Sequence, residues 1–123
     1  MSEKRYLIQM GMGVDLHGQN PTKAASRAVH NAIANNCLCG ISDVLHAKHA
    51  EEKMHVHVLV ACPKPEQVDK EAVLKELPFG VKSIEVTEGG MVTPHAYSPE
   101  LGDKTGETYV ANAAVTVAVN SKL

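Results

Sequence analysis

The sequence predicts an α+β fold, a single domain over residues 1–123 with the element order β-α-β-α-β-β, in which two helices cover one face of a four-stranded mixed sheet. Three observations indicate this fold. Two segments alternate between apolar and other residues, and a third has apolar residues at helical spacing. The chain also has the length of one ordinary domain, with no repeat and no low-complexity linker.

The first strand and the first helix follow from local residue types. Residues Arg5–Met10 are rich in strand formers and run into Gly11 and Gly13, where the chain is expected to change direction. Asn20 suits the N-cap of a helix, with a proline directly after it, and small apolar residues then recur at helical spacing. We therefore expect a helix over Pro21–Asn36 that lays an alanine-rich face on the sheet.

In the middle of the chain, a segment without a clear periodic pattern is followed by one that alternates between two residue types. Ile41–Met54 has a short apolar pattern that a polar stretch interrupts, and we expect a short helix and a turn there. His55–Ala61 alternates, with three valines on one face and His55, His57 and Leu59 on the other. This segment is expected to be the second strand.

A second helix and two further strands complete the fold. Asp69 can cap a helix that Pro78 and Gly80 end. Val81–Thr87 has the composition of the third strand, and Tyr109–Val119 alternates as the last one.

The two faces of the predicted sheet differ. Both helices are expected on one face, because crossover connections between parallel strands are right-handed. The opposite face would carry Gln9, His55, His57 and Leu59 with alternate residues of the last strand. This mixture is too apolar for free exposure and too polar for a core. It is typical of a subunit interface or of a site between subunits.

Composition narrows the classes of partner. A formal net charge of −2 and a pI near 6.4 leave no broad cationic surface for nucleic acid or anionic lipid. No apolar run has the length of a signal peptide or a membrane span, so a cytoplasmic location is expected, with neither nucleic acid nor membrane as partner. Cys37, Cys39 and Cys62 form no Cys-x-x-Cys pair and are interpreted as reduced, mostly buried thiols, in preference to a Cys37-x-Cys39 metal pair.

The segment Gly11–Gly18 concentrates residue types that bind ligands. Its Asp15 and His17 can converge on one point, and an oxygen and a nitrogen donor at this spacing suit Zn²⁺ or Mn²⁺, with His30 as the nearest further ligand. The alternative is structural: Asp15 caps loop amides and holds His17 as a packed hydrogen-bond partner. The glycines expected to let a ligand approach the backbone are Gly11, Gly13 and Gly18.

Two other polar groups are open to a functional and a structural interpretation. The loop Thr87–His95 carries Glu88 and His95, and it is either a glycine turn with a proline-stiffened connection or a ligand-contacting loop. A cluster of four histidines is interpreted as solvated or interfacial in preference to a metal site. Its members are His46, His49, His55 and His57.

The segment Gly11-Met12-Gly13-Val14-Asp15-Leu16-His17-Gly18 resembles the N-terminal Gly-x-Gly-x-Asp-x-His-Gly signature of a family of small conserved hypothetical proteins without an assigned function. The likeness runs along most of the chain, including Pro65–Gly80. This resemblance names a family and implies no activity.

A fainter resemblance points to the repeating domains of cyanuric acid hydrolase and barbiturase, ring-opening amidohydrolases with the toblerone fold. His57–Pro63 is similar to a strand that ends in Cys-Pro, and Thr87–Gly90 with Pro94-His95 is similar to a Thr-Glu-Gly loop that ends in Pro-His. A catalytic serine precedes that run in those enzymes, whereas Ile84-Glu85-Val86 stands here. The resemblance implies a toblerone-like or ferredoxin-like arrangement and a homotrimer, because those enzymes place three such domains around a pseudo-threefold axis. Gly13-x-Asp15-x-His17 is also similar to the metal-binding Asp-x-His of methylerythritol cyclodiphosphate synthase, another trimer.

These features support three hypotheses. The first is a homotrimeric small-molecule-binding protein with amidohydrolase-like chemistry, whose site between subunits uses Asp15, His17, Lys23, Glu88 and His95. Asp15 or His17 would be a general base or substrate anchor, and Lys23, at the start of the helix, would hold an anionic or carbonyl group. The second is a divalent-metal enzyme in which Asp15, His17 and His30 hold Zn²⁺ or Mn²⁺. The third is a structural trimer without catalysis.

Overall fold

The C-terminal strand is the centre of the sheet. The structure is a computed structural model that describes residues 2–44 and 54–121. Its sheet has the strand order β1-β5-β2-β3, and β4 pairs with β5 beyond the end of β2. All pairings are antiparallel except that between β2 and β3. The strands are β1 (Ser2–Asp15), β2 (Met54–Cys62), β3 (Val81–Glu88), β4 (Met91–Pro94) and β5 (Glu107–Ser121).

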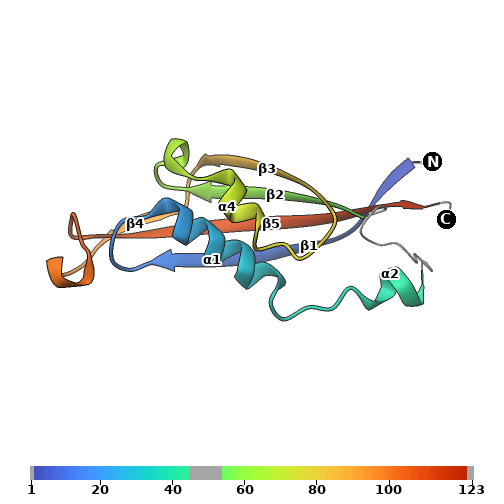
Figure 1. Ribbon diagram of the computed structural model, residues 1–123, viewed down its shortest axis with the longest axis horizontal. Coiled ribbons are helices and arrows are strands. Elements are labelled where there is room, and N and C mark those ends of the chain that lie inside the picture. Colours follow the sequence, from blue (N-terminus) through green and yellow to red (C-terminus); the bar gives the residue numbers. More distant parts are fainter. Residues whose placement is uncertain (1, 45–53, 122–123) are drawn as a thin grey trace.

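The helices are short apart from the first one. Figure 1 shows α1 and α4 on the same face of the sheet, and the two ends of the chain side by side. Asn20 caps α1 by accepting a hydrogen bond from the backbone N–H of Lys23, and Asp69 caps α4 in the same way through Ala72. The helices are α1 (Pro21–Ile33), α2 (Cys39–Asp43) and α4 (Lys70–Leu74), with single 3₁₀ turns η1 (Pro65–Gln67) and η2 (Pro99–Leu101). None of the described helices is long and apolar enough to cross a membrane.

The α+β class is confirmed, and the sheet differs from the prediction in two respects. It has five strands and not four, because Met91–Pro94 adds a strand too short to show a periodic pattern. The first strand also continues through Gly11 and Gly13 to Asp15, where a loop was expected. The predicted short helix in Ile41–Met54 corresponds in part to α2, and the rest of that prediction lies outside the described residues.

The two strand glycines are explained by the packing of α1 on β1. A Cβ atom at Gly11 would collide with the backbone carbonyl oxygen of Ala28, and one at Gly13 would collide with that of Ala24. Both collisions are with helix backbone, which cannot move without moving the whole helix. The Gly-x-Gly pattern is therefore a contact surface for the alanine-rich face of α1, and the predicted role of these glycines in approaching a ligand is not what the structure shows.

The alternation predicted for β2 is confirmed. Its valines point into the core with the odd-numbered residues of β5 from Tyr109 to Val119, under the buried alanines of α1. The prediction for Gln9 is wrong, because this side chain lies on the helix-covered face and the residue is only 9% exposed. β1 has a register irregularity between Arg5 and Leu7, so the residues after it point to the opposite face from the one that unbroken alternation would give. Gln9 therefore pairs with the core residue Val115.

The opposite side of the sheet, called the open face below, has no described helix on it (Figure 1). Large apolar side chains on this face are 39–69% exposed. They are Ile8, Met10, Met12 and Leu59, and β4 adds Met91.

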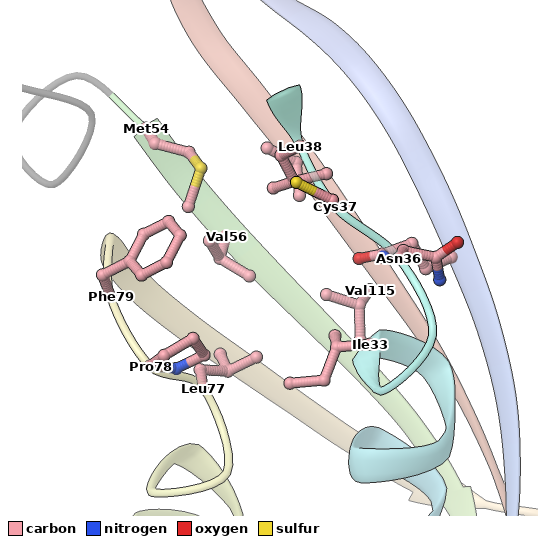
Figure 2. Close-up of a pocket in the computed structure, with 12 residues that line it drawn as sticks. Ile33, Asn36, Cys37, Leu38, Met54, Val56, Leu77, Pro78, Phe79 and Val115 are labelled. Atoms are coloured by element: carbon pink, nitrogen blue, oxygen red, sulfur yellow. The ribbon is translucent and has the colours of Figure 1, made fainter. Parts of the chain in front are cut away.

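A cavity of about 260 Å³ lies on the helix-covered face, at the end of α1 (Figure 2). A helix of 13 residues is about 20 Å long, whereas the 15 residues of β5 span about 50 Å, so α1 cannot cover the strands along their full length. The cavity lies over a part of the sheet that α1 does not cover. Its floor includes Val56 and Val115, and Ile33 and Phe79 stand on opposite sides.

The cysteines are all free, but two of the three are not buried as predicted. Cys37 is exposed in the connection before α2, and Cys39 is exposed as the first residue of that helix. Cys62 is fully buried at the end of β2, and burial raises the pKa of its thiol to about 11.

Candidate functional site

A buried carboxylate, Asp103, joins the two connections that meet beyond the end of β1. Its side chain is fully buried and accepts hydrogen bonds from the backbone N–H groups of Gly18 and Ser98, both at 3.0 Å. The first connection links β1 to α1, and the second links β4 to β5. Asp103 therefore ties together segments more than 80 residues apart in sequence. With Gln19, His17 and His95 it forms what we call the Asp103 cluster.

Gln19 uses the full bonding capacity of its amide in this cluster. Its Nε2 lies 3.0 Å from Oδ1 of Asp103 and within 3.2 Å of the carbonyl oxygens of Thr105 and Glu107. Its Oε1 accepts the backbone N–H groups of Lys104, at 2.8 Å, and Thr105, at 3.2 Å. An amide side chain offers two donors and two acceptor sites, so none is left over. These bonds fix the backbone of residues 104–107. The backbone of Gln19 itself has a left-handed φ of 52°.

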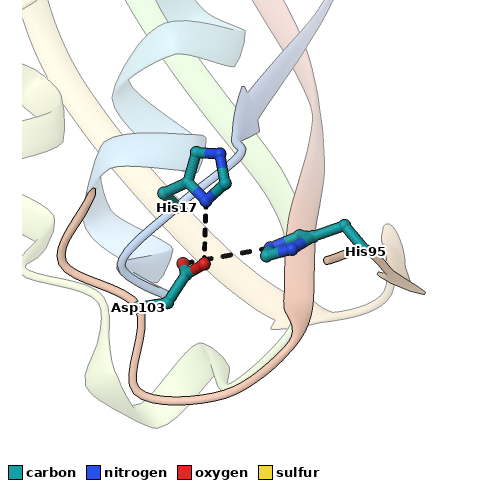
Figure 3. A group of neighbouring side chains, drawn as sticks. All are labelled: His17, His95 and Asp103. Atoms are coloured by element: carbon teal, nitrogen blue, oxygen red, sulfur yellow. Dashed lines mark hydrogen bonds and ion pairs between the residues drawn. The ribbon is translucent and has the colours of Figure 1, made fainter. Parts of the chain in front are cut away.

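His17 is the most exposed member of the cluster. Its Nδ1 lies 2.8 Å from Oδ2 of Asp103 (Figure 3), and its side chain is 30% exposed. The ionised carboxylate can only accept, so the proton of a neutral His17 sits on Nδ1. The other ring nitrogen, Nε2, then carries the lone pair. No described residue occupies Nε2, which leaves it available to a ligand.

His95 is held on both sides by the backbone. Its Nδ1 lies 2.7 Å from the carbonyl oxygen of Ala96, and its Nε2 lies 2.9 Å from that of Glu107. Both oxygens are acceptors, so each ring nitrogen of His95 faces a backbone acceptor. Asp103 lies 3.9 Å away, and the ring packs edge-on against that of His17 at a centroid distance of 4.8 Å.

Two opposing effects set the ionisation of Asp103. Burial raises the pKa of this carboxyl group, but hydrogen bonds from His17, Ser98, Gln19 and Gly18 outweigh burial and hold the pKa far below its ordinary value of 3.8. The group is therefore a permanent anion at neutral pH. An anion fixed beside an imidazole orients the ring.

Metal-ligating side chains come together at this cluster. Among the described residues, the one group of three or more whose donor atoms lie within 4.8 Å of one another is His17, His95 and Asp103. Asp15 and His30, expected as ligands beside His17, are not part of it. Asp15 accepts the backbone N–H of Asn20 at 2.8 Å and contacts Arg27 at 3.4 Å. This is the structural role that the sequence left open for Asp15.

The remaining residues expected at the site are dispersed. Lys23 and His30 line a shallow cleft of about 340 Å³ on the outer side of α1, and His30 lies 3.5 Å from Glu76 there. Glu88 is exposed at the end of β3. Of the residues expected to form one site, the structure brings together only His17 and His95.

The described part of the histidine-rich segment forms separate pairs on the open face. His57 lies 2.7 Å from the hydroxyl of Ser83, and His55 lies 3.4 Å from Glu3. His46 and His49 lie outside the described residues.

A family model described as a conserved hypothetical protein, Lin0512_fam, matches residues 5–117 of the chain. The chain belongs to the Lin0512 family. The match confirms the expected membership of a conserved hypothetical family. This Lin0512 chain is also similar to a crystal structure from Nostoc punctiforme, an FtsZ-like protein of unknown function. The two share 52% sequence identity over 98% of this chain and 99% of the other, with a TM-score of 0.89. No curated protein matches the chain.

Sequence reasoning missed Asp103 and Gln19, which organise the cluster. Asp103 stands in Gly102-Asp103, a pair typical of turns, and nothing local distinguishes it from a surface residue. Gln19 directly follows the segment Gly11–Gly18, and a single glutamine carries no local signal of a structural role. One signal was present in the length of the connection before β5, since long loops in compact domains are often functional.

Proposed function

We propose that this Lin0512 family member binds a small molecule at the Asp103 cluster and that His17 is the residue that exchanges a proton with it. One observation carries the proposal. A buried, permanently ionised carboxylate holds Nδ1 of a partly exposed histidine at 2.8 Å, which leaves Nε2 as a base of fixed orientation. A carboxylate that orients an imidazole in this way is a recurring part of hydrolytic sites.

The proposed chemistry is amidohydrolase-like only in a limited sense. His17 would take a proton from water as it attacks a carbonyl carbon, and would return it to the leaving group. The Ser-Lys chemistry of the toblerone-fold enzymes is not proposed, because no serine stands before Thr87 in the corresponding register. The left-handed Gly18 and the five contacts of Gln19 support a rigid backbone next to His17.

Hydrolysis of p-nitrophenyl acetate tests whether His17 is an accessible base. The rate with the wild-type protein should exceed that with an equal concentration of imidazole, and His17→Gln should lower it at least tenfold. His30→Gln is the matched control, because His30 is more exposed than His17 and pairs with a carboxylate that is not buried. An unchanged rate in His17→Gln, or an equal loss in His30→Gln, would contradict the proposal.

Binding of a divalent cation is a second candidate function, favoured by the proximity of donor atoms on His17, His95 and Asp103. An ion there would displace hydrogen bonds that Asp103 accepts and would free Nε2 of His95 from the carbonyl oxygen of Glu107. Zn²⁺ or Mn²⁺ at about 100 times its dissociation constant would stabilise the fold by about 2.7 kcal/mol. Thermal unfolding with and without each ion measures this, and His17→Gln should abolish the shift. A wild-type melting temperature that neither ion raises would exclude the cation.

We also propose that copies of the chain associate through the open face as homotrimers, the assembly that the toblerone-like resemblance implies. Large exposed apolar side chains gathered on one face are typical of association surfaces. Sedimentation velocity tests this proposal. Met10→Glu should reduce the assembly to monomers, whereas Leu101→Glu, at a comparably exposed apolar residue in η2, should not. A wild-type chain that sediments as a monomer would contradict it.

A further inference from the structure

The cavity at the end of α1 is bounded by apolar side chains from four parts of the chain. Figure 2 shows Met54 and Val56 of β2, Ile33 of α1, Val115 of β5 and Phe79 of the connection before β3 around one space. Four of these five belong to the core or pack against it, and Phe79 is 38% exposed. A space of about 260 Å³ is larger than the engineered cavity of about 150 Å³ that binds benzene in another protein.

One polar side chain, Gln9, faces this cavity without a partner. Gln9 is 9% exposed and lines the cavity, and no described residue forms a hydrogen bond with its amide. No nitrogen or oxygen atom of the described side chains is both shielded from solvent and without a partner, so the Gln9 amide, which has no protein partner, is accessible to solvent. Within a mostly apolar lining, this amide offers a hydrogen bond to a guest that replaces water. The amide is therefore placed to meet a guest.

The lining also defines the charge of that guest. Among the described residues that line the cavity there is no aspartate, glutamate, lysine, arginine or histidine. A charged molecule would lose its hydration and find no counter-charge. The Asn36 amide adds a second polar group, but its Nδ2 already donates to the carbonyl oxygen of Ala32.

We infer that this cavity is a binding site for a neutral, mostly apolar small molecule, about the size of a bicyclic aromatic ring, that carries one hydroxyl or carbonyl group bonded to the Gln9 amide. The site is separate from the Asp103 cluster, because none of the cluster residues lines the cavity. It does not depend on the function proposed for that cluster.

Methyl NMR of the full chain with 2-naphthol tests the inference. This probe is neutral, bicyclic and carries one hydroxyl group, and 2-naphthoate is a control of the same size with a negative charge. Saturable shifts are expected for the methyl groups of Ile33, Val56 and Leu77, with Ile8 on the open face unchanged. The naphthoate should bind at least tenfold more weakly. Shifts confined to the open face, or equal affinity for both compounds, would overturn the inference.

Two variants complete the test. Gln9→Met preserves the shape of the side chain and removes the hydrogen bond, so the affinity for 2-naphthol should fall about tenfold. Val56→Phe places a ring in the cavity and should abolish binding. If Val56→Phe does not fold, Gln9→Met decides alone, and an affinity within twofold of wild type would overturn the inference.

Discussion

The two buried glutamines of this protein should differ sharply in what they contribute to stability. Gln9 and Gln19 are equally buried, each 9% exposed. Gln19 fills its amide capacity with hydrogen bonds to the two connections, whereas Gln9 has no partner among the described residues. Replacing each by methionine removes the amide while keeping the length of the side chain. The pair of variants therefore isolates the contribution of the bonds.

The expected magnitudes follow from the number of bonds. The four bonds that one amide can form are worth about 1 kcal/mol each, and the more apolar methionine regains about 1 kcal/mol by burial. Gln19→Met should then lower the free energy of unfolding by about 3 kcal/mol. Gln9→Met loses no bond and should leave the free energy unchanged or raise it by about 1 kcal/mol.

Urea unfolding followed by far-ultraviolet circular dichroism measures both values, since the chain has no tryptophan to report by fluorescence. The slope against urea should be the same in all three proteins. If both variants lose the same free energy of unfolding, within about 0.5 kcal/mol, then Gln19 does not stabilise the fold more than Gln9 does, and the distinction between the two residues is refuted.

Three further outcomes are expected. Because the pKa of Asp103 is lowered in the folded protein, its ionised side chain stabilises the fold fully above about pH 4, and this stabilisation is lost as the pH falls below 3.8 toward the pKa of the folded protein. Asp103→Asn should therefore lower the free energy of unfolding at pH 7 and make that free energy decline less in acid. Parallel acid unfolding curves for the variant and the wild type would contradict this. Cys37 and Cys39 should react with iodoacetamide at pH 7.5 while Cys62, with a pKa of about 11, reacts only after unfolding; mass spectrometry that finds all three modified at one rate would argue otherwise. Gly13→Ala should lower the free energy of unfolding by about 2 kcal/mol because its methyl group meets helix backbone, and an unchanged urea midpoint would show that α1 does not press on β1 there.

The sequence predicted those parts of the fold whose signals are local. The alternation of His55–Ala61 is confirmed as β2, and Asn20 caps α1 as expected. The four-residue β4 could not be seen, because its strand geometry depends on pairing with β5. The prediction for Gly11 and Gly13 was wrong for a related reason. A glycine needed for close helix packing looks the same in sequence as one needed for a ligand loop.

The candidate site was recovered only in part. His17 and His95 were both expected, and the structure brings their rings together across 78 positions of sequence. Asp103 and Gln19 were missed because their importance lies in long-range bonds that no local pattern encodes. Asp15 was expected to face a ligand beside His17, yet its carboxylate is engaged by Asn20 and Arg27. Proximity in sequence thus predicted the wrong partner for His17.

The central position of β5 has a consequence for biosynthesis. Among the described strands β1 pairs only with β5, whereas β2 pairs with both β3 and β5, so β1 cannot join the rest of the sheet until β5 has been made. From Asp15 to Glu107 the ribosome adds 92 residues, which takes about 5–20 s at cellular rates. During that interval β1 has no strand to pair with, and β2 can pair only with β3. We expect the nascent chain to need a chaperone that shields β1 until β5 emerges.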